Sequence, residues 1–421
     1  MSTDKENDPP IVVVGAGAAG SMAAIFAAAQ GRRTLLVERT RDGGKKILIS
    51  GGGRCNVLPS RVDPAQYFTE SSRNTLKKML LSWPLAEQRR FFEEELRIPL
   101  ALEQESGKLF PRSNRARDVR DGLLDYAHQQ GVEPVFSSSV VALRPPADSS
   151  TWTVVLDGGR EIAAAAVVLA TGGLSVPATG SDGTGFRLVR QLGHTVHDTY
   201  AALTPLTTDP AVHAELAGVS LEVRLEAPLA RGTLQASGGF LFTHRGYSGP
   251  SVLNVSHLAV RSAGDPARRV PVHAQWTEMD AGAWDTLLRE PGPGEIGGLV
   301  RRRLPQRLAD RLLEEAGVDP WRTRSQLRRE ERARLVEVLA RYPLPWTGDE
   351  GYKKAEVTGG GVPLAEVDAR TMESRVAPGL FLCGEILDCF GPIGGYNFCW
   401  AWATGRAAGL GAAASLEGRA S

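Results

Sequence analysis

The first forty residues alternate between short apolar runs and a stretch of small residues. "IVVVG" at 11–15 is a β-branched run that ends in glycine, which is typical of a strand buried on both faces. "AAGSMAAIFAAAQG" at 18–31 has the alanine-rich composition of a helix closed by glycine. "RRTLLVER" at 32–39 predicts a second strand. Strand, helix and strand within about thirty residues match the length of one dinucleotide-binding βαβ unit.

Three glycines in this unit have the spacing G-x-G-x-x-G. Gly15 permits a tight turn after the strand, Gly17 lets backbone amides approach a pyrophosphate, and Gly20 lets the helix pack closely on the strand. Glu38 ends the second strand, where a carboxylate accepts hydrogen bonds from ribose hydroxyls and disfavours the 2′-phosphate of NADP. The pattern therefore predicts a site for NAD or FAD.

The apolar segment at 11–29 is also long enough to suggest a membrane span. However, the preceding "STDKENDPP" is mixed and mostly acidic, and the segment contains three glycines. A secretory signal has a positively charged flank and a cleavage site of small residues. We therefore expect neither a membrane span nor a signal peptide.

A second glycine-rich stretch, "GKKILISGGGRCNVLPS", occupies 44–60. It begins shortly after the second strand, at the sheet edge that faces the ligand crevice in doubly wound folds. Lys45 and Lys46 can neutralise a diphosphate, and Gly51–Gly53 lets main chain lie against a flat ring or phosphates. A Walker A loop is excluded because its G-x-x-x-x-G-K-[ST] spacing is absent here.

The remaining chain changes pattern twice. "AAAAVVLATGG" at 163–173 predicts another buried strand, and alternating residues with Gly and Pro breaks at 201–275 predict an antiparallel β-rich insert. From 281 to 342 the pattern is helical and arginine-rich. Acidic residues are interleaved at helical spacing, which favours ion pairs on solvated faces over nucleic-acid binding.

Composition narrows the picture further. The chain has 421 residues, 42% of them hydrophobic, which is enough for two or three domains. Its net charge of +1 argues neither for nucleic acid nor for an acidic partner. The four cysteines form no C-x-x-C pair, so no disulfide framework or metal site is expected. Such cysteine usage fits a reducing cytoplasm, which is the expected location.

Several motifs together resemble a bacterial flavoprotein family that includes aminoacetone oxidase and 3-dehydro-bile-acid reductase. They are, in order, "VVGAGAAG", "KKILISGGGRCN", "LFTHRGYSGP", "KAEVTGGGV", "TMES", "GEILD" and "GGYNFCWAWATG". The resemblance covers 11–409 and implies FAD as the cofactor. It also implies an α/β fold: a discontinuous Rossmann-like FAD-binding domain (1–200 and 350–421), an inserted β-rich domain (201–280) and a small helical domain (281–349).

On this resemblance the C-terminal part returns to the flavin. "GLFLCGE" at 379–385 predicts a buried strand, after which Asp388 is placed to bond ribityl hydroxyls. Gly394 and Gly395 precede a final helix with Asn397 near its cap. A helix N-terminus beside the isoalloxazine would stabilise negative charge on the reduced ring. The resemblance also assigns the backbone at Val140 or Val141 to the adenine.

The predicted FAD-binding residues are Gly15, Gly17, Ala18, Ala19, Gly20, Glu38, Arg39, Lys45, Lys46, Ser50, Gly51, Gly52, Gly53, Arg54, Cys55, Asn56, Val140, Val141, Thr171, Gly172, Gly384, Glu385, Asp388, Gly394, Gly395, Tyr396 and Asn397. Acid–base candidates are His244 and Tyr247 in the insert, which is expected to cap the flavin, and Tyr396.

These observations predict an FAD-dependent oxidoreductase that acts on a small molecule by hydride transfer at the flavin. The alternative is an FAD-binding accessory protein that contacts RNA through its arginine-rich helices. Because only one Rossmann fingerprint is present, either NAD(P)H docks transiently over the flavin or another reductant is used. The choice between an oxidase and an NAD(P)H-dependent reductase stays open, as does the oligomeric state.

Overall fold

The computed structural model describes residues 8–147, 151–265, 267 and 269–417. The chain divides into two compact units, Met1–Thr199 with Val357–Ser421, and Tyr200–Glu356. The second unit is thus inserted into the first along the chain. The finer division of the second unit into separate β-rich and helical domains stays a prediction.

The first unit is built on a five-stranded parallel sheet with the order β20-β10-β1-β2-β6. Its strands are β1 (Ile11–Val14), β2 (Thr34–Val37), β6 (Val132–Val135), β10 (Ala166–Leu169) and β20 (Leu380–Leu382). Every residue of β1, β2, β10 and β20 is buried, as expected for a parallel sheet covered on both faces. The strands predicted from the apolar runs are therefore confirmed, and with them the α/β fold.

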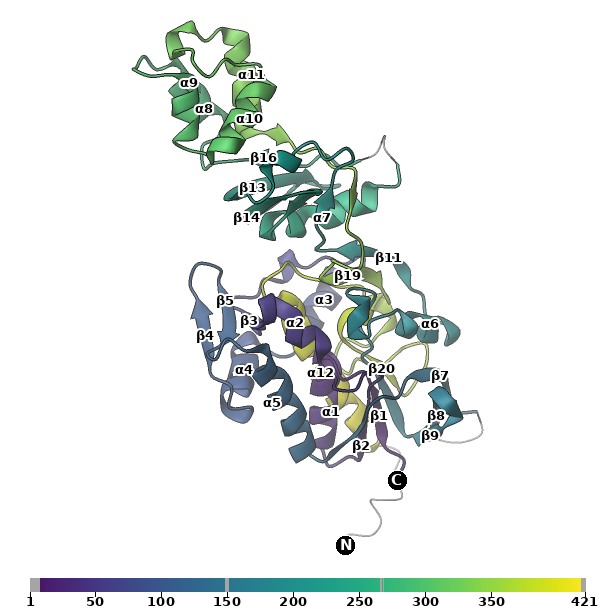
Figure 1. Cartoon of the computed structure of the whole chain (residues 1–421). Coiled ribbons are helices and arrows are strands. Elements are labelled where there is room, and N and C mark those ends of the chain that lie inside the picture. The colour runs from purple at the N-terminus through teal and green to yellow at the C-terminus, as the bar shows by residue number, and fades with distance from the viewer. Residues whose placement is uncertain (1–7, 148–150, 266, 268, 418–421) are drawn as a thin grey trace. The chain divides into compact units, whose positions relative to one another are not determined.

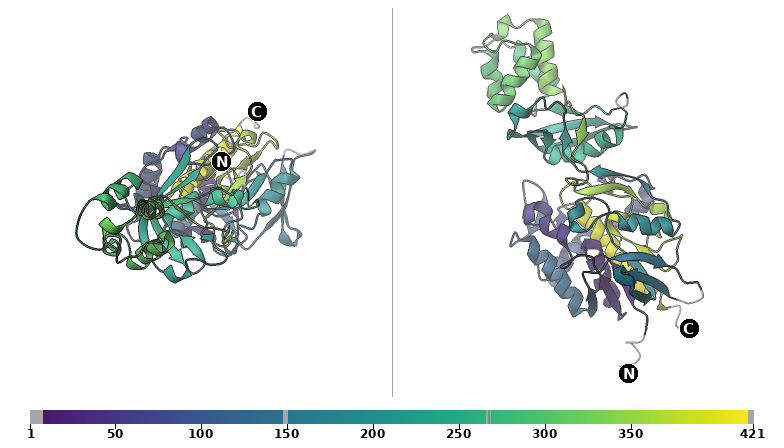
Figure 2. Two further views of the ribbon diagram at one scale, coloured as in Figure 1. Left: turned by 90° about the horizontal axis from the view of Figure 1, so that it is seen from above. Right: turned by 45° about the vertical axis from the view of Figure 1, so that its right-hand side comes forward.

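Two helices, α1 (Ala18–Ala28) and α12 (Tyr396–Ala414), lie side by side against this sheet (Figures 1 and 2). Glycines on α12 permit the approach. A Cβ atom at Gly405 would lie 2.3 Å from the Ala19 carbonyl oxygen, and one at Gly409 would lie 2.3 Å from that of Ala23. The first and last helices are thus packed main chain to main chain.

Smaller elements surround the sheet in the first unit. The other helices are α2 (Lys45–Gly53), α3 (Arg73–Leu80), α4 (Leu85–Arg90), α5 (Ala116–Gln129) and α6 (Thr184–Gln191). Two antiparallel sheets join β3 (Leu58–Pro59), β5 (Lys108–Pro111) and β4 (Leu100–Glu103), and β7 (Val140–Arg144), β8 (Trp152–Leu156) and β9 (Glu161–Ala164). A two-stranded sheet pairs β11 (His197–Ala202) with β19 (Val357–Gly361).

The second unit contains a seven-stranded sheet whose pairs are all antiparallel, as predicted for 201–275. In spatial order its strands are β17 (Tyr342–Pro343), β16 (His273–Gln275), β13 (Ser220–Pro228), β14 (Thr233–Thr243), β15 (Gly246–Ser248), β12 (Leu206–Thr207) and β18 (Gly348–Asp349). One helix in this region, α7 (Pro250–Ser262), was not predicted and packs against β13 and β14. Its buried residues Val252, Val255 and Ala259 recur at helical spacing.

The predicted helical segment of the second unit is confirmed. It forms α8 (Ala281–Arg289), α9 (Ile296–Arg301), α10 (Gln306–Ala316) and α11 (Arg329–Ala340). In the described part of the chain, no helix is long and apolar enough to cross a membrane.

A buried polar group, which we call the His213 cluster, joins the sheet to α10 within the second unit. His213 Nδ1 lies 2.8 Å from the Tyr247 hydroxyl, and His213 Nε2 lies 3.2 Å from both Glu315 Oε1 and the Tyr342 hydroxyl. Arg311 Nε donates to Glu315 Oε1 at 2.6 Å. Burial raises the pKa of the Glu315 carboxyl, but the hydrogen bonds from these partners outweigh it and bring the pKa to about 2.

Candidate functional site

The glycines of the βαβ turn are required for different reasons. Gly15 has a φ of 102°, and a Cβ there would lie 2.5 Å from the Ala170 carbonyl oxygen. A Cβ at Gly20 would lie 1.7 Å from the Gly15 oxygen, so this glycine permits close helix–strand packing. Gly17 is the residue before α1, with an ordinary extended φ of −82°, and a Cβ there would meet nothing within 4 Å. No described residue therefore requires a glycine at position 17, which faces open space at the positive end of α1.

Glu38 is buried and already engaged by main chain. Its Oε2 accepts a hydrogen bond from the Ala16 amide at 2.8 Å, and its Oε1 accepts one from the Thr40 amide at 2.7 Å. The carboxylate thus holds the glycine turn to the end of β2. Each oxygen retains a second lone pair, so a ribose hydroxyl can still be accepted.

The second glycine-rich stretch forms α2 and then turns. The backbone leaves helical geometry at Ser50, with ψ of 149°. Gly51, Gly52 and Gly53 follow with φ of 56°, 68° and 83°, all in the left-handed region that glycine adopts most easily. A Cβ at Gly52 would meet nothing within 4 Å, so the main chain is bare on that side. These glycines are therefore needed first for backbone conformation, and the open side at Gly52 leaves room for a ligand.

Lys46 and Glu385 form an ion pair although they are 339 positions apart. Lys46 Nζ lies 2.7 Å from Glu385 Oε2 and 2.6 Å from the Ser175 hydroxyl, which donates to Glu385 Oε1 at 2.6 Å. The Thr358 amide donates to the same oxygen at 2.9 Å. The contact of Lys46 with a diphosphate stays a prediction; in the structure its ammonium group neutralises this partly buried carboxylate.

Two buried hydroxyls at the carboxyl edge of the sheet have no hydrogen-bond partner among the described residues. They belong to Thr171, which follows β10, and Thr40, which follows β2. Nearly all buried polar groups in native proteins are hydrogen-bonded, so these two hydroxyls are candidates for a hydrogen bond to a cofactor at this edge. Together with the space beside Gly17 and Gly52, these hydroxyls fit a dinucleotide cofactor along this edge.

The turn before α12 is shaped by two glycines and one asparagine. Gly394 and Gly395 have φ of 112° and 96°, and a Cβ at Gly395 would lie 2.6 Å from the Leu58 carbonyl carbon. Asn397 Oδ1 accepts from the Gly391 amide at 2.9 Å, and its Nδ2 donates to the Gly391 oxygen at 3.0 Å. The residue that caps α12 is Gly395, whereas Asn397 folds the preceding turn.

The two glycine-rich segments meet at β5. A Cβ at Gly51 would lie 3.1 Å from the Phe110 ring, and one at Gly394 would lie 3.5 Å from Lys108 Cε. Phe110 and Lys108 are two residues apart on the same strand. The structure therefore brings Gly51–Gly53 and the N-terminus of α12 into one neighbourhood.

Several predicted residues have partners of their own. Arg54 pairs with Glu103 at 3.0 Å, and its guanidinium lies 4.0 Å from the centre of the Phe110 ring. Cys55 is fully buried, and burial raises the pKa of its thiol to about 12, so it is a packing residue.

Two more predicted residues contact the α6 region. Arg39 pairs with Asp182, and the Val141 carbonyl accepts two hydrogen bonds from Arg187 at 3.3 Å. Other predicted residues lie elsewhere in the first unit. Lys45 and Asn56 are half-buried. Gly172, next to Thr171, has a φ of 71°, and Gly384 has a φ of 76° and donates its amide hydrogen to the Thr404 hydroxyl.

Asp388 takes part in a polar pair that the sequence did not predict. Its Oδ2 accepts from the Thr69 hydroxyl at 3.2 Å and the Glu70 amide at 2.9 Å, and lies 3.1 Å from His197 Nδ1. His197 is 27% exposed, whereas Asp388 is buried. A carboxylate that orients an accessible imidazole is a common arrangement for proton transfer. From the sequence, only Asp388 could be assigned to a site; nothing pointed to His197, because it lies 191 positions from Asp388 along the chain.

The other acid–base candidates have contrasting surroundings. Tyr396 is half-buried, the Tyr67 hydroxyl donates to its carbonyl at 2.9 Å, and burial raises the pKa of its phenol. In the second unit, His244 is exposed in the turn between β14 and β15. Tyr247 is fully buried in the His213 cluster, where burial raises the pKa of its phenol, and is therefore a core residue.

Comparison with known proteins decides the family. The model described as "HI0933-like protein Rossmann domain" matches residues 9–411. The chain belongs to this family. Membership of this FAD-binding Rossmann family implies FAD as the cofactor and makes the chain an FAD-dependent oxidoreductase, as predicted. No group of three or more His, Cys, Asp or Glu residues that suits a metal ion occurs among the described residues.

Two curated members of the HI0933-like family match nearly the whole chain. "Ribosomal RNA dihydrouridine synthase" of Escherichia coli (strain K12) is 33% identical over 375 residues, covering 88% of this chain and 89% of the relative. "3-dehydro-bile acid delta(4,6)-reductase" of Clostridium scindens is 32% identical over 387 residues, covering 90% and 92%. Among solved structures, 3-ketosteroid-Δ4-(5α)-dehydrogenase from Rhodococcus jostii RHA1 matches with a TM-score of 0.51 and 15% identity, covering 98% of each chain. This last likeness shows the fold alone.

Proposed function

We propose that this chain is an FAD-dependent reductase of a carbon–carbon double bond conjugated to a carbonyl group. The supporting observation is that two relatives with unrelated substrates, at 33% and 32% identity, are both named for such a reduction. Dihydrouridine is uridine with one ring double bond reduced, and that bond is conjugated to a ring carbonyl. A delta(4,6)-reductase likewise reduces ring double bonds. Shared chemistry across different substrates favours the reaction type over either substrate.

The described residues provide the binding surface that this reaction needs. When bound, FAD supplies the hydride chemistry. The N-terminus of α1 beside Gly17 would present its first amides to the pyrophosphate, and Thr171 would offer its hydroxyl, which has no partner among the described residues. The bare main chain at Gly52 and the amides that begin α12 complete the cofactor-binding surface. These assignments extend the sequence predictions to particular atoms.

Saturating the double bond takes one hydride and one proton, and each turnover consumes two electrons from NAD(P)H or another reductant. Two groups of the first unit suit the proton. The raised pKa of Tyr396 keeps its hydroxyl protonated at neutral pH, so this hydroxyl can donate. His197 can carry a proton on Nε2 while Nδ1 faces Asp388. Between them, Tyr396 is favoured because it begins α12 beside the glycine turn.

Anaerobic half-reactions test the proposal. The purified FAD-loaded protein is reduced with NADPH, NADH or dithionite, and then mixed with 4-androstene-3,17-dione or with uridine-containing RNA. We expect rapid flavin reoxidation by at least one acceptor and a product heavier by two hydrogens in mass spectrometry. If neither acceptor reoxidises the flavin, while an amine bleaches the oxidised enzyme and oxygen restores its colour, the protein is an oxidase and the proposal fails.

Single variants separate the proton donors. A general acid contributes about 10²- to 10⁴-fold to rate. We therefore expect Tyr396→Phe to slow flavin reoxidation by at least about 100-fold, with the reductive half-reaction unchanged. His197→Gln serves as the matched comparison. If only His197→Gln slows reoxidation, the donor is His197.

A further inference from the structure

Several arginines in the helical part of the second unit have no carboxylate partner among the described residues, although the eleven acidic residues of this segment leave it with a net charge of only +2. Residues 281–349 contain thirteen arginines. Six pair with carboxylates, and three of these pairs have the intrahelical i,i+4 spacing that the sequence predicted. The other seven have no carboxylate within 4.0 Å among the described residues. They are Arg302, Arg303, Arg307, Arg324, Arg328, Arg329 and Arg334.

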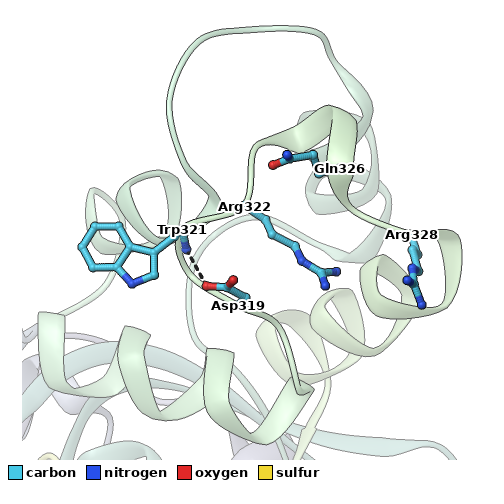
Figure 3. Close-up of a pocket in the computed structure, with 5 residues that line it drawn as sticks. All are labelled: Asp319, Trp321, Arg322, Gln326 and Arg328. Atoms are coloured by element: carbon cyan, nitrogen blue, oxygen red, sulfur yellow. Dashed lines mark hydrogen bonds between the residues drawn. The ribbon is translucent and has the colours of Figure 1, made fainter.

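One of these unpaired arginines lines a pocket next to an exposed tryptophan. The segment between α10 and α11 forms an open pocket of about 570 Å³. We call it the Trp321 pocket; it is lined by Asp319, Trp321, Arg322, Gln326 and Arg328 (Figure 3). Trp321 is 68% exposed, more than any other large hydrophobic residue in the part of the chain that the structure describes. In Figure 3 Arg322 points toward Arg328, whereas the indole projects from the other side of the segment.

The segment that carries this tryptophan is fixed by hydrogen bonds. The Ile296 amide donates to the Arg322 carbonyl and the Gly297 amide donates to the Pro320 carbonyl, both at 2.8 Å. The Arg322 guanidinium pairs with Glu331 at 2.6 Å. A lone exposed aromatic residue is ordinary on protein surfaces. Here, however, the indole stands on a backbone held by hydrogen bonds at one edge of a polar pocket. The opposite edge carries Arg328, which forms no ion pair within 4.0 Å among the described residues, although its charge helps to lower the pKa of Glu331.

We infer that the Trp321 pocket binds single-stranded RNA. An indole stacks on any nucleobase, and guanidinium groups bind the phosphates on either side of that base. Arg328 is available for a phosphate, and the Gln326 amide can bond a base edge. RNA is chosen over DNA because two relatives of this chain are named for ribosomal RNA. This inference revises the expectation that the helical segment does not contact nucleic acid.

Equilibrium binding tests the inference without any redox step. The FAD-loaded full-length protein is titrated into 5′-fluorescein-labelled U12 RNA at several salt concentrations, and anisotropy is recorded. Stacking on one aromatic side chain is worth about 1–3 kcal/mol. We therefore expect Trp321→Ala to raise Kd at least about fivefold, whereas Trp321→Phe, which keeps a ring, stays near wild type. Removing a phosphate contact with Arg328→Ala lowers the salt slope of log K by about 0.7.

The matched control is Arg289→Ala. It removes an exposed arginine of the same segment, but one that is paired with Asp285 at 2.8 Å, and we expect less than a twofold change in Kd. Trp321 and Arg328 are exposed, so their variants should keep the wild-type denaturation curve.

The inference is overturned if U12 RNA does not bind, or if Trp321→Ala and Arg328→Ala bind like wild type. It is also overturned if duplex RNA binds equally well, because paired bases cannot stack on the indole. If RNA binding fails while 4-androstene-3,17-dione still reoxidises the flavin, the proposed function stands without this site. If RNA binds and no acceptor reoxidises the flavin, the reductase proposal fails and the RNA site stands.

Discussion

Gly17 offers a clean test of the cofactor site, because the protein itself has no need for a glycine there. Its φ of −82° is open to any residue, and a Cβ would meet nothing within 4 Å. In Gly17→Ala, the weaker capping by alanine costs about 0.5–1 kcal/mol, and the smaller entropy of the unfolded chain offsets about 0.4–1 kcal/mol. The free energy of unfolding of the FAD-free protein should therefore stay within about 0.5 kcal/mol of wild type.

FAD affinity should respond very differently to the same methyl group. If the pyrophosphate occupies the space beside Gly17, the methyl displaces it from the amides at the start of α1. Losing one hydrogen bond to a charged group costs about 1.5–3 kcal/mol, which raises Kd about 10- to 150-fold. Urea denaturation of the apoprotein measures stability, and quenching of flavin fluorescence measures affinity.

The matched control is Gly264→Ala. It also adds a methyl group in open space without a left-handed φ, but lies in the second unit, so it should change neither quantity. Wild-type FAD affinity in Gly17→Ala would refute the placement of the pyrophosphate at this turn.

Three further predictions use the same assays. Thr171→Val removes a buried hydroxyl that has no hydrogen-bond partner among the described residues, so the stability of the apoprotein should not fall. The Kd for FAD should rise about fivefold, which corresponds to a lost hydrogen bond of about 1 kcal/mol. Unchanged affinity would mean that the hydroxyl does not face FAD. Gly409→Ala places a methyl group 2.3 Å from the Ala23 carbonyl oxygen, so it should lower the free energy of unfolding in urea by roughly 1–2 kcal/mol after the gain in helix propensity. The control Gly122→Ala should be near neutral, because its Cβ meets only the flexible end of the Ile98 side chain. Equal effects of the two substitutions would contradict the packing argument. The pKa of Glu315 is lowered to about 2, below the value of about 4.5 for a free Glu side chain, so the ionised carboxylate stabilises the folded protein fully above about pH 4.5. This stabilisation is lost as the pH falls toward about 2. Glu315→Gln should flatten that part of the plot of stability against pH, and an unchanged slope would contradict the assignment.

Local features of the first unit were predictable from the sequence. The fully buried strands, the glycine spacing of the first turn and the glycines before α12 each leave a signal within a few residues. In the second unit, the helical periodicity and the alternation of apolar and polar residues also predicted the helices and strands that the structure shows. By contrast, α7 was missed because its residues lie within a region dominated by strand patterns.

The partnerships between distant residues were not predictable. The Lys46–Glu385 pair and the His197–Asp388 pair join residues 339 and 191 positions apart, so no local pattern in the sequence links them. A sequence motif also does not identify the hydrogen-bond partner of a charged residue within it. Glu38 was singled out for a ribose, yet its nearest bonds are to the Ala16 and Thr40 amides.

The hydrogen bonds at the two ends of the inserted unit have a practical consequence. The Glu356 amide donates to the Leu203 carbonyl at 3.2 Å, and Leu206 in β12 is paired with Asp349 in β18. The segment from 200 to 356 thus begins and ends at one spot, held by its own main chain. Because β11 (His197–Ala202) runs across the first boundary and pairs with β19 (Val357–Gly361), an exchange of this segment between relatives would have to carry both strands with it, with the junctions placed outside that two-stranded sheet.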